Sequence, residues 1–426
     1  MKKLLSGALA ILLPSMLFAS TDIAASEGIA VGGIRLEFIF FALTLMGVAL
    51  FHNRVLLVAS TGLIAILALR LFSTDFDLLH HLEHEWEILV NLFGLLLGFS
   101  ILAKHFEDSG VPDYLPRILP AGWKGAFALL VLIFIMSAFL DNIAAAIIGG
   151  SIGLVIFKGN VHIGFLAAMV AASNAGGAGS VVGDTTTTMM WIDGVAIGDV
   201  VHAFIGAIPA LFAFGIIAAK QQDKHQPIIK DLSVAAKPIN VQKLMICVLI
   251  LIGAISTNIL LDFPAVGVWV AILIGALITK TPWKEVPAVL PGTFFLISLV
   301  LAASMMPVDQ LPEASWQSAF ALGFISSIFD NIPLTKLALD QGGYDWGVLA
   351  YAVGYGGSMV WFGSSAGVAL SNLYPQAKSV GQWVRHGWHV IIAYVIGFFI
   401  MLGLLGWHPH APHRDNAGDT AVESSH

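Results

Sequence analysis

Two Asp-Asn pairs stand in apolar sequence, where charged side chains are rare. Their surroundings are similar, SAFLDNI at 137–143 and SSIFDNI at 326–332. A third carboxylate, Asp184, follows a glycine-rich stretch and precedes a run of threonines. Because carboxylate, amide and hydroxyl oxygens are the ligands of hard cations, these motifs predict a cation site. The alternative for Asp141 and Asp330 is that each only caps a helix, since Asp is a favoured N-cap residue.

The glycine-rich segments form a second repeated pattern, Gly-Gly-x5-Gly. Its glycines are Gly176, Gly177 and Gly183 in the first segment and Gly356, Gly357 and Gly363 in the second. A glycine inside a helix costs about 1 kcal/mol relative to alanine, which favours a break in each helix. A broken helix exposes backbone groups to a bound ion. The alternative is close packing of small residues between helices.

The residues that we predict to bind the ion and the proton combine both patterns. They are Asp141, Asn142, Asp330, Asn331, Asp184, Ser173, Asn174, Thr185, Thr186, Ser364 and Ser365. Burial disfavours the charged form of a carboxylate, whereas a bound cation favours it. A proton and Na⁺ would therefore compete for the three aspartates. Exchange follows if the loaded site faces alternate sides of a membrane.

The composition places the chain in a bilayer. Of its 426 residues, 58% are hydrophobic and only 11% are charged, and the mean hydropathy is +0.87. We expect an all-α polytopic membrane protein, because helices satisfy their own backbone groups in lipid. The net charge of −7 argues against nucleic acid as a partner. Cys247 is the single cysteine, and we find no motif of a membrane-embedded enzyme, so we expect no cofactor besides the transported ions.

Ten apolar stretches are candidates for membrane spans. They are 34–51, 55–72, 88–103, 162–190, 197–219, 243–261, 264–279, 287–306, 344–372 and 387–406. Two further pairs are too short to span comfortably, namely 124–140 with 142–157 and 316–329 with 332–341. We expect each pair to be a re-entrant hairpin with its Asp-Asn at the tip. Segment 73–87 has no Lys or Arg, so we interpret it, with its histidines and glutamates, as a solvated external loop.

The polar linker 220–242 divides the chain into two halves with the same order of predicted helices. The first half, 30–219, begins outside and the second, 243–406, begins inside. This arrangement predicts inverted-topology repeats with two re-entrant hairpins and two broken helices. Residues 1–24 are interpreted as a signal peptide or a retained first helix, and 407–426 as a histidine-containing tail.

These same segments resemble the ion transporter superfamily of citrate, dicarboxylate and arsenite carriers, and within it the NhaD-type sodium/proton antiporters. The resemblance is densest at 137–149, 173–194, 329–339 and 350–370. It implies a scaffold domain, a transport domain, an elevator-like motion and a homodimer in the inner membrane. Dicarboxylate carriers of the superfamily have Ser-Asn-Thr at the hairpin tips, where this chain has Asp-Asn-Ile. The segment 178–185 lacks a Trp and a Pro of the NhaD pattern.

Secondary active exchange of Na⁺ or Li⁺ for protons is the function that these features favour. Coupled uptake of a carboxylate such as citrate is the alternative. An anionic substrate would favour helix N-termini or an arginine in the core, and neither motif has an arginine nearby. Broken helices in inverted repeats suit alternating access better than a channel. Lys336, in the second short pair, could pair with Asp330 or another acid, or extend to the membrane surface.

Overall fold

The structure, a computed structural model, is almost entirely helical. The residues that it describes are 29–31, 33–51, 54–74, 76–229 and 238–410. The expected all-α class is confirmed, apart from two short antiparallel strands, β1 (Ala30–Val31) and β2 (Ile34–Arg35). The signal peptide or first helix expected at 1–24 lies outside the described residues, as do parts of the linker and most of the tail.

Within the described ranges, six helical segments are long and apolar enough to cross a membrane. They are α3 (Val55–Ser73), α4 (Leu78–Asp108), α10 with α11 (Ile197–His225), α12 (Val241–Leu261), α14 (Glu285–Ser304) and α20 (Trp388–Leu405). Shorter apolar helices pack beside them, α2 (Leu36–Leu50) on α3 and α13 (Pro264–Ile278) on α12. Each long segment overlaps a span that the sequence predicts.

The segments with the candidate site residues fold into short helices in two similar series. The first series is α6 (Trp123–Ser137), α7 (Asn142–Ile156), α8 (Ile163–Gly177) and α9 (Thr185–Ile192). The second is α15 (Trp316–Ser326), α16 (Asn331–Gln341), α17 (Trp346–Gly356) and α18 (Ser365–Leu373). The remaining short elements are α5 (Val111–Ile118), α19 (Val380–His386), η1 (Val308–Gln310) and η2 (Pro375–Ala377). In both series, an Asp-Asn lies at the tip between the first two helices, and a glycine-rich non-helical segment separates the last two.

Helix α4 is far longer than the span that the sequence predicts. We expected a span at 88–103 with a solvated loop before it, and the loop prediction is wrong because the helix begins at Leu78. The Asp77 carboxylate accepts a hydrogen bond from the Leu79 N–H at 2.9 Å and caps the helix. The polar composition of the first turns concealed this helix from an analysis based on apolar runs.

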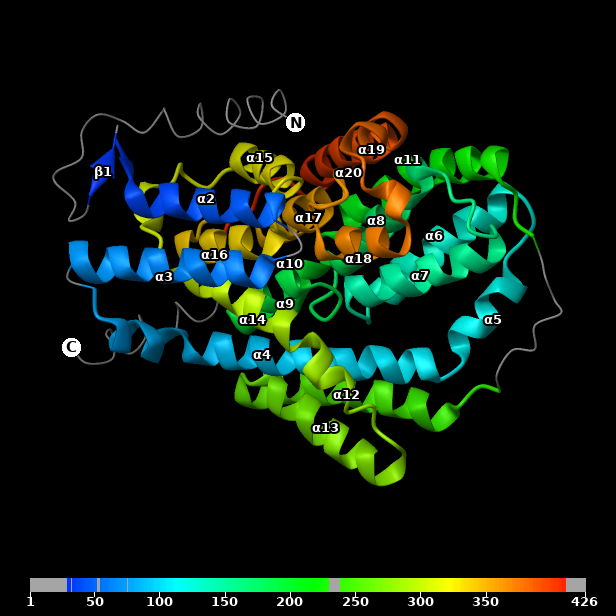
Figure 1. Ribbon diagram of the computed structural model, residues 1–426, viewed down its shortest axis with the longest axis horizontal. Coiled ribbons are helices and arrows are strands. Elements are labelled where there is room, and N and C mark those ends of the chain that lie inside the picture. The colour runs from blue at the N-terminus through cyan, green and yellow to red at the C-terminus, as the bar shows by residue number, and fades with distance from the viewer. Residues whose placement is uncertain (1–28, 32, 52–53, 75, 230–237, 411–426) are drawn as a thin grey trace.

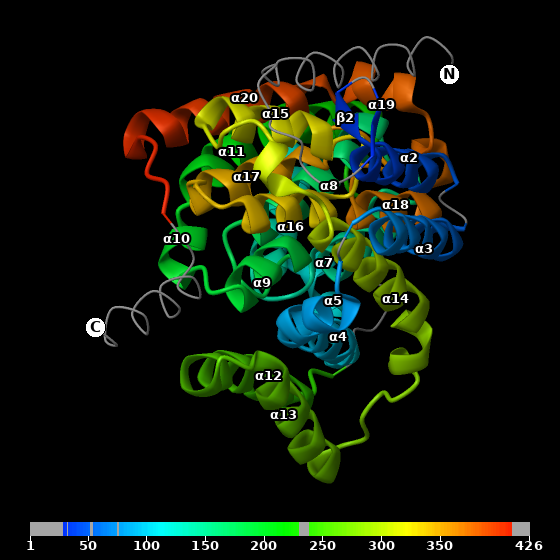
Figure 2. The same ribbon diagram turned by 90° about the vertical axis from the view of Figure 1, so that its left-hand side faces the viewer.

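Helix α4 lies between two groups of helices (Figure 1; Figure 2). On one side it packs on α12 and α13, which also pack tightly against each other. On the other side it packs on α14, α9 and α7. Large apolar side chains of α12 and α13, such as Ile259 and Leu277, are exposed, as expected for helix faces in contact with lipid.

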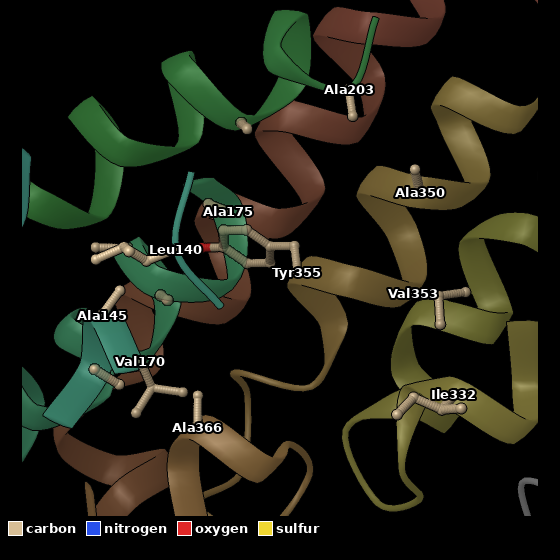
Figure 3. Close-up of a cluster of buried hydrophobic side chains, with 14 of the residues drawn as sticks. Leu140, Ala145, Val170, Ala175, Ala203, Ile332, Ala350, Val353, Tyr355 and Ala366 are labelled. Atoms are coloured by element: carbon tan, nitrogen blue, oxygen red, sulfur yellow. The ribbon is translucent and has the colours of Figure 1, made fainter. Parts of the chain in front are cut away.

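The core lies where the two series of short helices meet (Figure 3). Ala145 of α7 and Val170 of α8 lie there, and Ala366 of α18 approaches Val170. Tyr355 points from α17 toward Ala175 of α8, and its hydroxyl donates a hydrogen bond to a carbonyl oxygen of α20 at 3.0 Å. Many of the buried side chains there are alanines, which allow the short helices to approach closely.

The glycines of the repeated pattern permit contact between helix backbones. A Cβ at Gly176 would overlap the carbonyl oxygen of Phe134 in α6, and one at Gly356 would overlap that of Gly323 in α15. The third glycine of each segment, Gly183 or Gly363, lies against the C-terminal end of α6 or α15 respectively. The glycines therefore serve close packing, the alternative raised by the sequence, at the same positions where the helices are interrupted.

Candidate functional site

Each of the three candidate aspartates begins a helix. Asp141 caps α7, Asp184 caps α9 and Asp330 caps α16. In each case Oδ1 accepts a hydrogen bond from the backbone N–H two residues ahead, at 2.7, 2.8 and 3.1 Å respectively. Ser364 caps α18 through its hydroxyl. Capping thus occupies one oxygen of each carboxylate and leaves the other for different partners.

Asp184 connects the two Asp-Asn tips. Asn142 donates Nδ2–H to Asp184 Oδ2 at 2.7 Å, and Asn331 donates to Asp184 Oδ1 at 3.4 Å. Asp184 is only 2% exposed, and Asp141 and Asp330 both interact with it electrostatically. One buried carboxylate therefore orients two tips that are far apart in the sequence.

The second oxygens of the two tip aspartates differ in their surroundings. Asp330 Oδ2 accepts a hydrogen bond from the Ser365 hydroxyl at 3.4 Å. Asp141 Oδ2 accepts none from the residues that the structure describes. Of the three candidate aspartates, Asp141 is therefore the one with an oxygen free for a cation or a proton.

A small cavity adjoins Asp141 and Asp184. Its volume is about 10 Å³, close to the space that a single water molecule needs. One wall consists of the two aspartates with Thr185 and Thr188, and no basic side chain is among the described residues that line it. A cation that has shed its water fits this space, whereas citrate does not. Asp330 and its neighbours at the start of α18 do not line it.

Ser173 and Asn174 lie behind the α6–α7 tip and do not line the cavity. The Ser173 hydroxyl donates a hydrogen bond to the carbonyl oxygen of Asn142. The Asn174 side chain accepts a hydrogen bond from Asn142 at 3.3 Å and donates one to Ser358 Oγ at 3.1 Å. These two residues of α8 therefore position Asn142 and connect it to the end of α17.

The four threonines that follow Asp184 have different surroundings. Thr185 lines the cavity, while Thr186 is buried and its side chain interacts with the Asp184 carboxylate. The hydroxyls of Thr187 and Thr188 donate to carbonyl oxygens of the non-helical segment between α8 and α9, at 2.6 and 2.8 Å. The last two threonines therefore hold this segment in place.

The cavity has lining residues that the sequence analysis did not single out. Besides Val182, they are Leu92, Leu95, Leu96 and Phe99 of α4. Their spacing of i, i+3, i+4 and i+7 places them on one face of the helix. Such spacing is common to every helix that packs in a membrane protein, so it carried no signal that this face adjoins a site.

Lys336 pairs with acids other than Asp330. Its Nζ lies 3.1 Å from the Glu85 carboxylate and also contacts Asp340. The side chains of Lys336 and Glu85 are 1% and 6% exposed, so the ion pair joins α16 to α4 in the interior. The prediction that this lysine pairs with an acid is confirmed, and its charge is compensated away from the cavity. The described residues contain no His, Cys, Asp and Glu cluster with the geometry of a metal site.

Comparison with known proteins finds distant relatives over most of the chain. Na⁺/H⁺ antiporter NhaD of Vibrio parahaemolyticus is 26% identical over 391 residues, which are 76% of this chain and 91% of that protein. Sodium/proton antiporter 1 of Arabidopsis thaliana is 26% identical over 343 residues, 70% of this chain. The chain is a distant homologue of sodium/proton antiporters. The resemblance to the NhaD type is thereby confirmed, and NhaD of Alkalimonas amylolytica is similar too, at 26% over 64% of this chain and 67% of its own length.

These relatives are transporters, and the membrane-length helices make the chain a multi-pass membrane protein. The chain spans 58% of the length of the Arabidopsis protein. No family model matches the sequence. Among solved structures, the YdaH transporter of Alcanivorax borkumensis aligns with 93% of this chain and 96% of its own, at 13% identity and a TM-score of 0.41, which is too low to decide the fold.

Proposed function

We propose that the chain exchanges Na⁺ or Li⁺ for protons across the inner membrane, as a secondary active antiporter that uses the cavity between Asp141 and Asp184. The composition of this cavity carries the proposal, because two aspartates and two threonines are among the residues that line a space of about 10 Å³. Oxygen atoms of these kinds bind hard cations. The relatives named as sodium/proton antiporters support the same exchange.

The two carboxylates have separate roles in this proposal. Asn142 and the α9 backbone fix the orientation of Asp184, so this side chain keeps its place at the cavity. Asp141 Oδ2 is free and exchanges its partner. In a site without bulk water, an unpaired carboxylate binds a proton, and a bound cation displaces that proton. Two carboxylates that line one small cavity titrate as a coupled pair, so proton and cation compete for the pair as a whole.

We propose further that the two series of short helices belong to an inverted-topology repeat of the ion transporter superfamily type. Residues 30–219 and 243–406 form the halves, and α6–α7 and α15–α16 are re-entrant hairpins that enter from opposite sides. The broken helices are α8–α9 and α17–α18. Matching caps and matching glycine contacts in both series support this architecture. We expect a homodimer in which the loaded site moves relative to α4.

Uptake of a carboxylate is the second candidate, and one observation favours it. Four helices, α7, α9, α16 and α18, begin around the candidate site, and helix N-termini attract anions. Carboxylates of the chain itself already cap three of the four. An anionic substrate would therefore meet like charges there, which leaves the cation as the better fit.

The test is transport by the purified protein in liposomes that contain a pH-sensitive dye. After a proton gradient is imposed, Na⁺, Li⁺, K⁺ or citrate is added. We expect Na⁺ and Li⁺ to drive proton movement, and we expect Asp141→Asn and Asp184→Asn each to lose about tenfold or more of it. The matched control is Asp262→Asn, at the exposed turn between α12 and α13.

Either of two results would overturn the proposal. A response to citrate alone would transfer the protein to the carboxylate class. Full Na⁺-driven proton movement in both asparagine variants would remove the cavity from the mechanism, even if the exchange itself were observed.

A further inference from the structure

One wall of the cavity between Asp141 and Asp184 is hydrocarbon. Leu92, Leu95, Leu96 and Phe99 of α4 form it, and the first two are 0% and 1% exposed. The lining residues with side-chain oxygen atoms are Asp141, Asp184, Thr185 and Thr188, which lie at the start of α7 and at the start and in the first turn of α9.

The opposite face of α4 is fixed to α13 (Figure 2). Gly94 and Gly98 let the two helices approach so closely that a Cβ at either position would overlap the side chain of Ala265 or Val268. The Trp269 indole N–H donates a hydrogen bond to the carbonyl oxygen of Gly94 at 3.0 Å. Helix α4 therefore cannot retreat from the cavity without being pressed into α13, with which it is already in close contact.

The hydrocarbon wall affects a bound cation only by limiting the volume of the cavity. Without polar atoms, it cannot replace the water molecules that a cation sheds on entry. Selectivity among similar cations depends on the size of the cavity, the number of ligands and their flexibility. Asp141 has a free oxygen and can adjust to the ion, whereas α4 is fixed against α13. The α4 wall is therefore the rigid boundary that sets the size of the cavity. K⁺ needs more space than Na⁺ or Li⁺.

We propose that the α4 face formed by Leu92, Leu95, Leu96 and Phe99 is the size filter of the cation site and excludes K⁺. This inference rests on the cation exchange proposed above. It assigns the discrimination between cations to side chains that do not bind the ion, while the carboxylates provide the charge.

Leu95→Ala and Phe99→Ala test the filter. In the same liposome assay, we measure the half-saturating concentrations of K⁺ and Na⁺. Each variant should shift their ratio in favour of K⁺ by about tenfold, the usual effect of altered volume in an apolar pocket. Leu97→Ala and Phe93→Ala are matched controls on the same helix, because neither side chain lines the cavity and Phe93 packs on Phe294 instead.

The outcomes separate the filter from the antiport. An unchanged ratio in the folded Leu95 and Phe99 variants, or an equal shift in the controls, would overturn the filter. Should Leu95→Ala fail to fold, Leu95→Val gives a smaller shift in the same direction. A wild-type protein that responds equally to Na⁺ and K⁺ would refute the filter and leave the antiport intact, whereas no response to any cation would refute both.

Discussion

At the scale of single residues, Asn142 makes the shortest side-chain hydrogen bond to Asp184, at 2.7 Å. Its side chain also donates to Asn174, and its carbonyl oxygen accepts the Ser173 hydroxyl. Asn331 occupies the corresponding position at the other tip, but its contact with Asp184 is longer, at 3.4 Å. The two asparagines thus occupy equivalent positions, but Asn142 makes the shorter hydrogen bond to the Asp184 carboxylate.

We expect Asn142→Ala to weaken Na⁺ binding more than Asn331→Ala does. A hydrogen bond to a charged group contributes about 1.5–3 kcal/mol, so the loss at Asn142 corresponds to roughly tenfold or more in affinity. Titration calorimetry of the detergent-purified protein measures the difference. Equal affinities in the two variants would show that the orientation of Asp184 does not depend on the shorter contact.

At the scale of elements, the glycine contacts hold the broken helix α8–α9 against α6. Gly176→Ala should lower the free energy of unfolding by about 1–3 kcal/mol, because its Cβ would overlap a backbone oxygen that cannot rotate away. Gly292→Ala in α14 is the control, since its Cβ would meet open space. The midpoints of thermal unfolding in detergent give the comparison. If Gly176→Ala unfolded at the same temperature as Gly292→Ala, α8 and α6 would be less tightly packed than they are in the structure.

The ion pair between α16 and α4 is a second contact between elements. Lys336→Met leaves the buried Glu85 without its partner and should cost about 3–5 kcal/mol of stability. Adding Glu85→Gln in the same chain should recover much of this loss, because the uncompensated charge is then removed. The same thermal midpoints test this, and a double variant no more stable than Lys336→Met would contradict the account.

The sequence predicted those features that are local, and the contacts between distant segments remained hidden. The Asp-Asn tips and the glycine-rich segments have strong local signals, and the structure places Asp141, Asp184 and Thr185 around one cavity. Pairing between Lys336 and Glu85 joins residues 251 positions apart, and no local pattern reveals which acid is the partner. The sequence did not indicate that Leu95 lines the cavity for a different reason. Leu95 is one of many apolar residues, and its residue type does not show which other residues it contacts.

At the scale of the whole molecule, competition between proton and cation should govern the pH dependence of transport. Lowering the pH raises the occupancy of the cavity carboxylates by protons. Where protons saturate the site, the half-saturating Na⁺ concentration should therefore rise as the pH falls. If one Na⁺ displaces one proton, the rise is about tenfold for each unit by which the pH is lowered. The maximal rate should change much less. Liposome assays over a series of external pH values measure both, and a half-saturating concentration independent of pH would contradict a shared site.

The central claim is that Na⁺ and the proton bind the same pair, Asp141 and Asp184. Proton release on Na⁺ binding tests it most directly, measured with a pH indicator in weakly buffered, detergent-purified protein and with no membrane present. The account predicts that Na⁺ releases protons from the wild type and that Asp141→Asn abolishes this release. Release of the same size from Asp141→Asn would contradict it, because the displaced proton would then belong to another group.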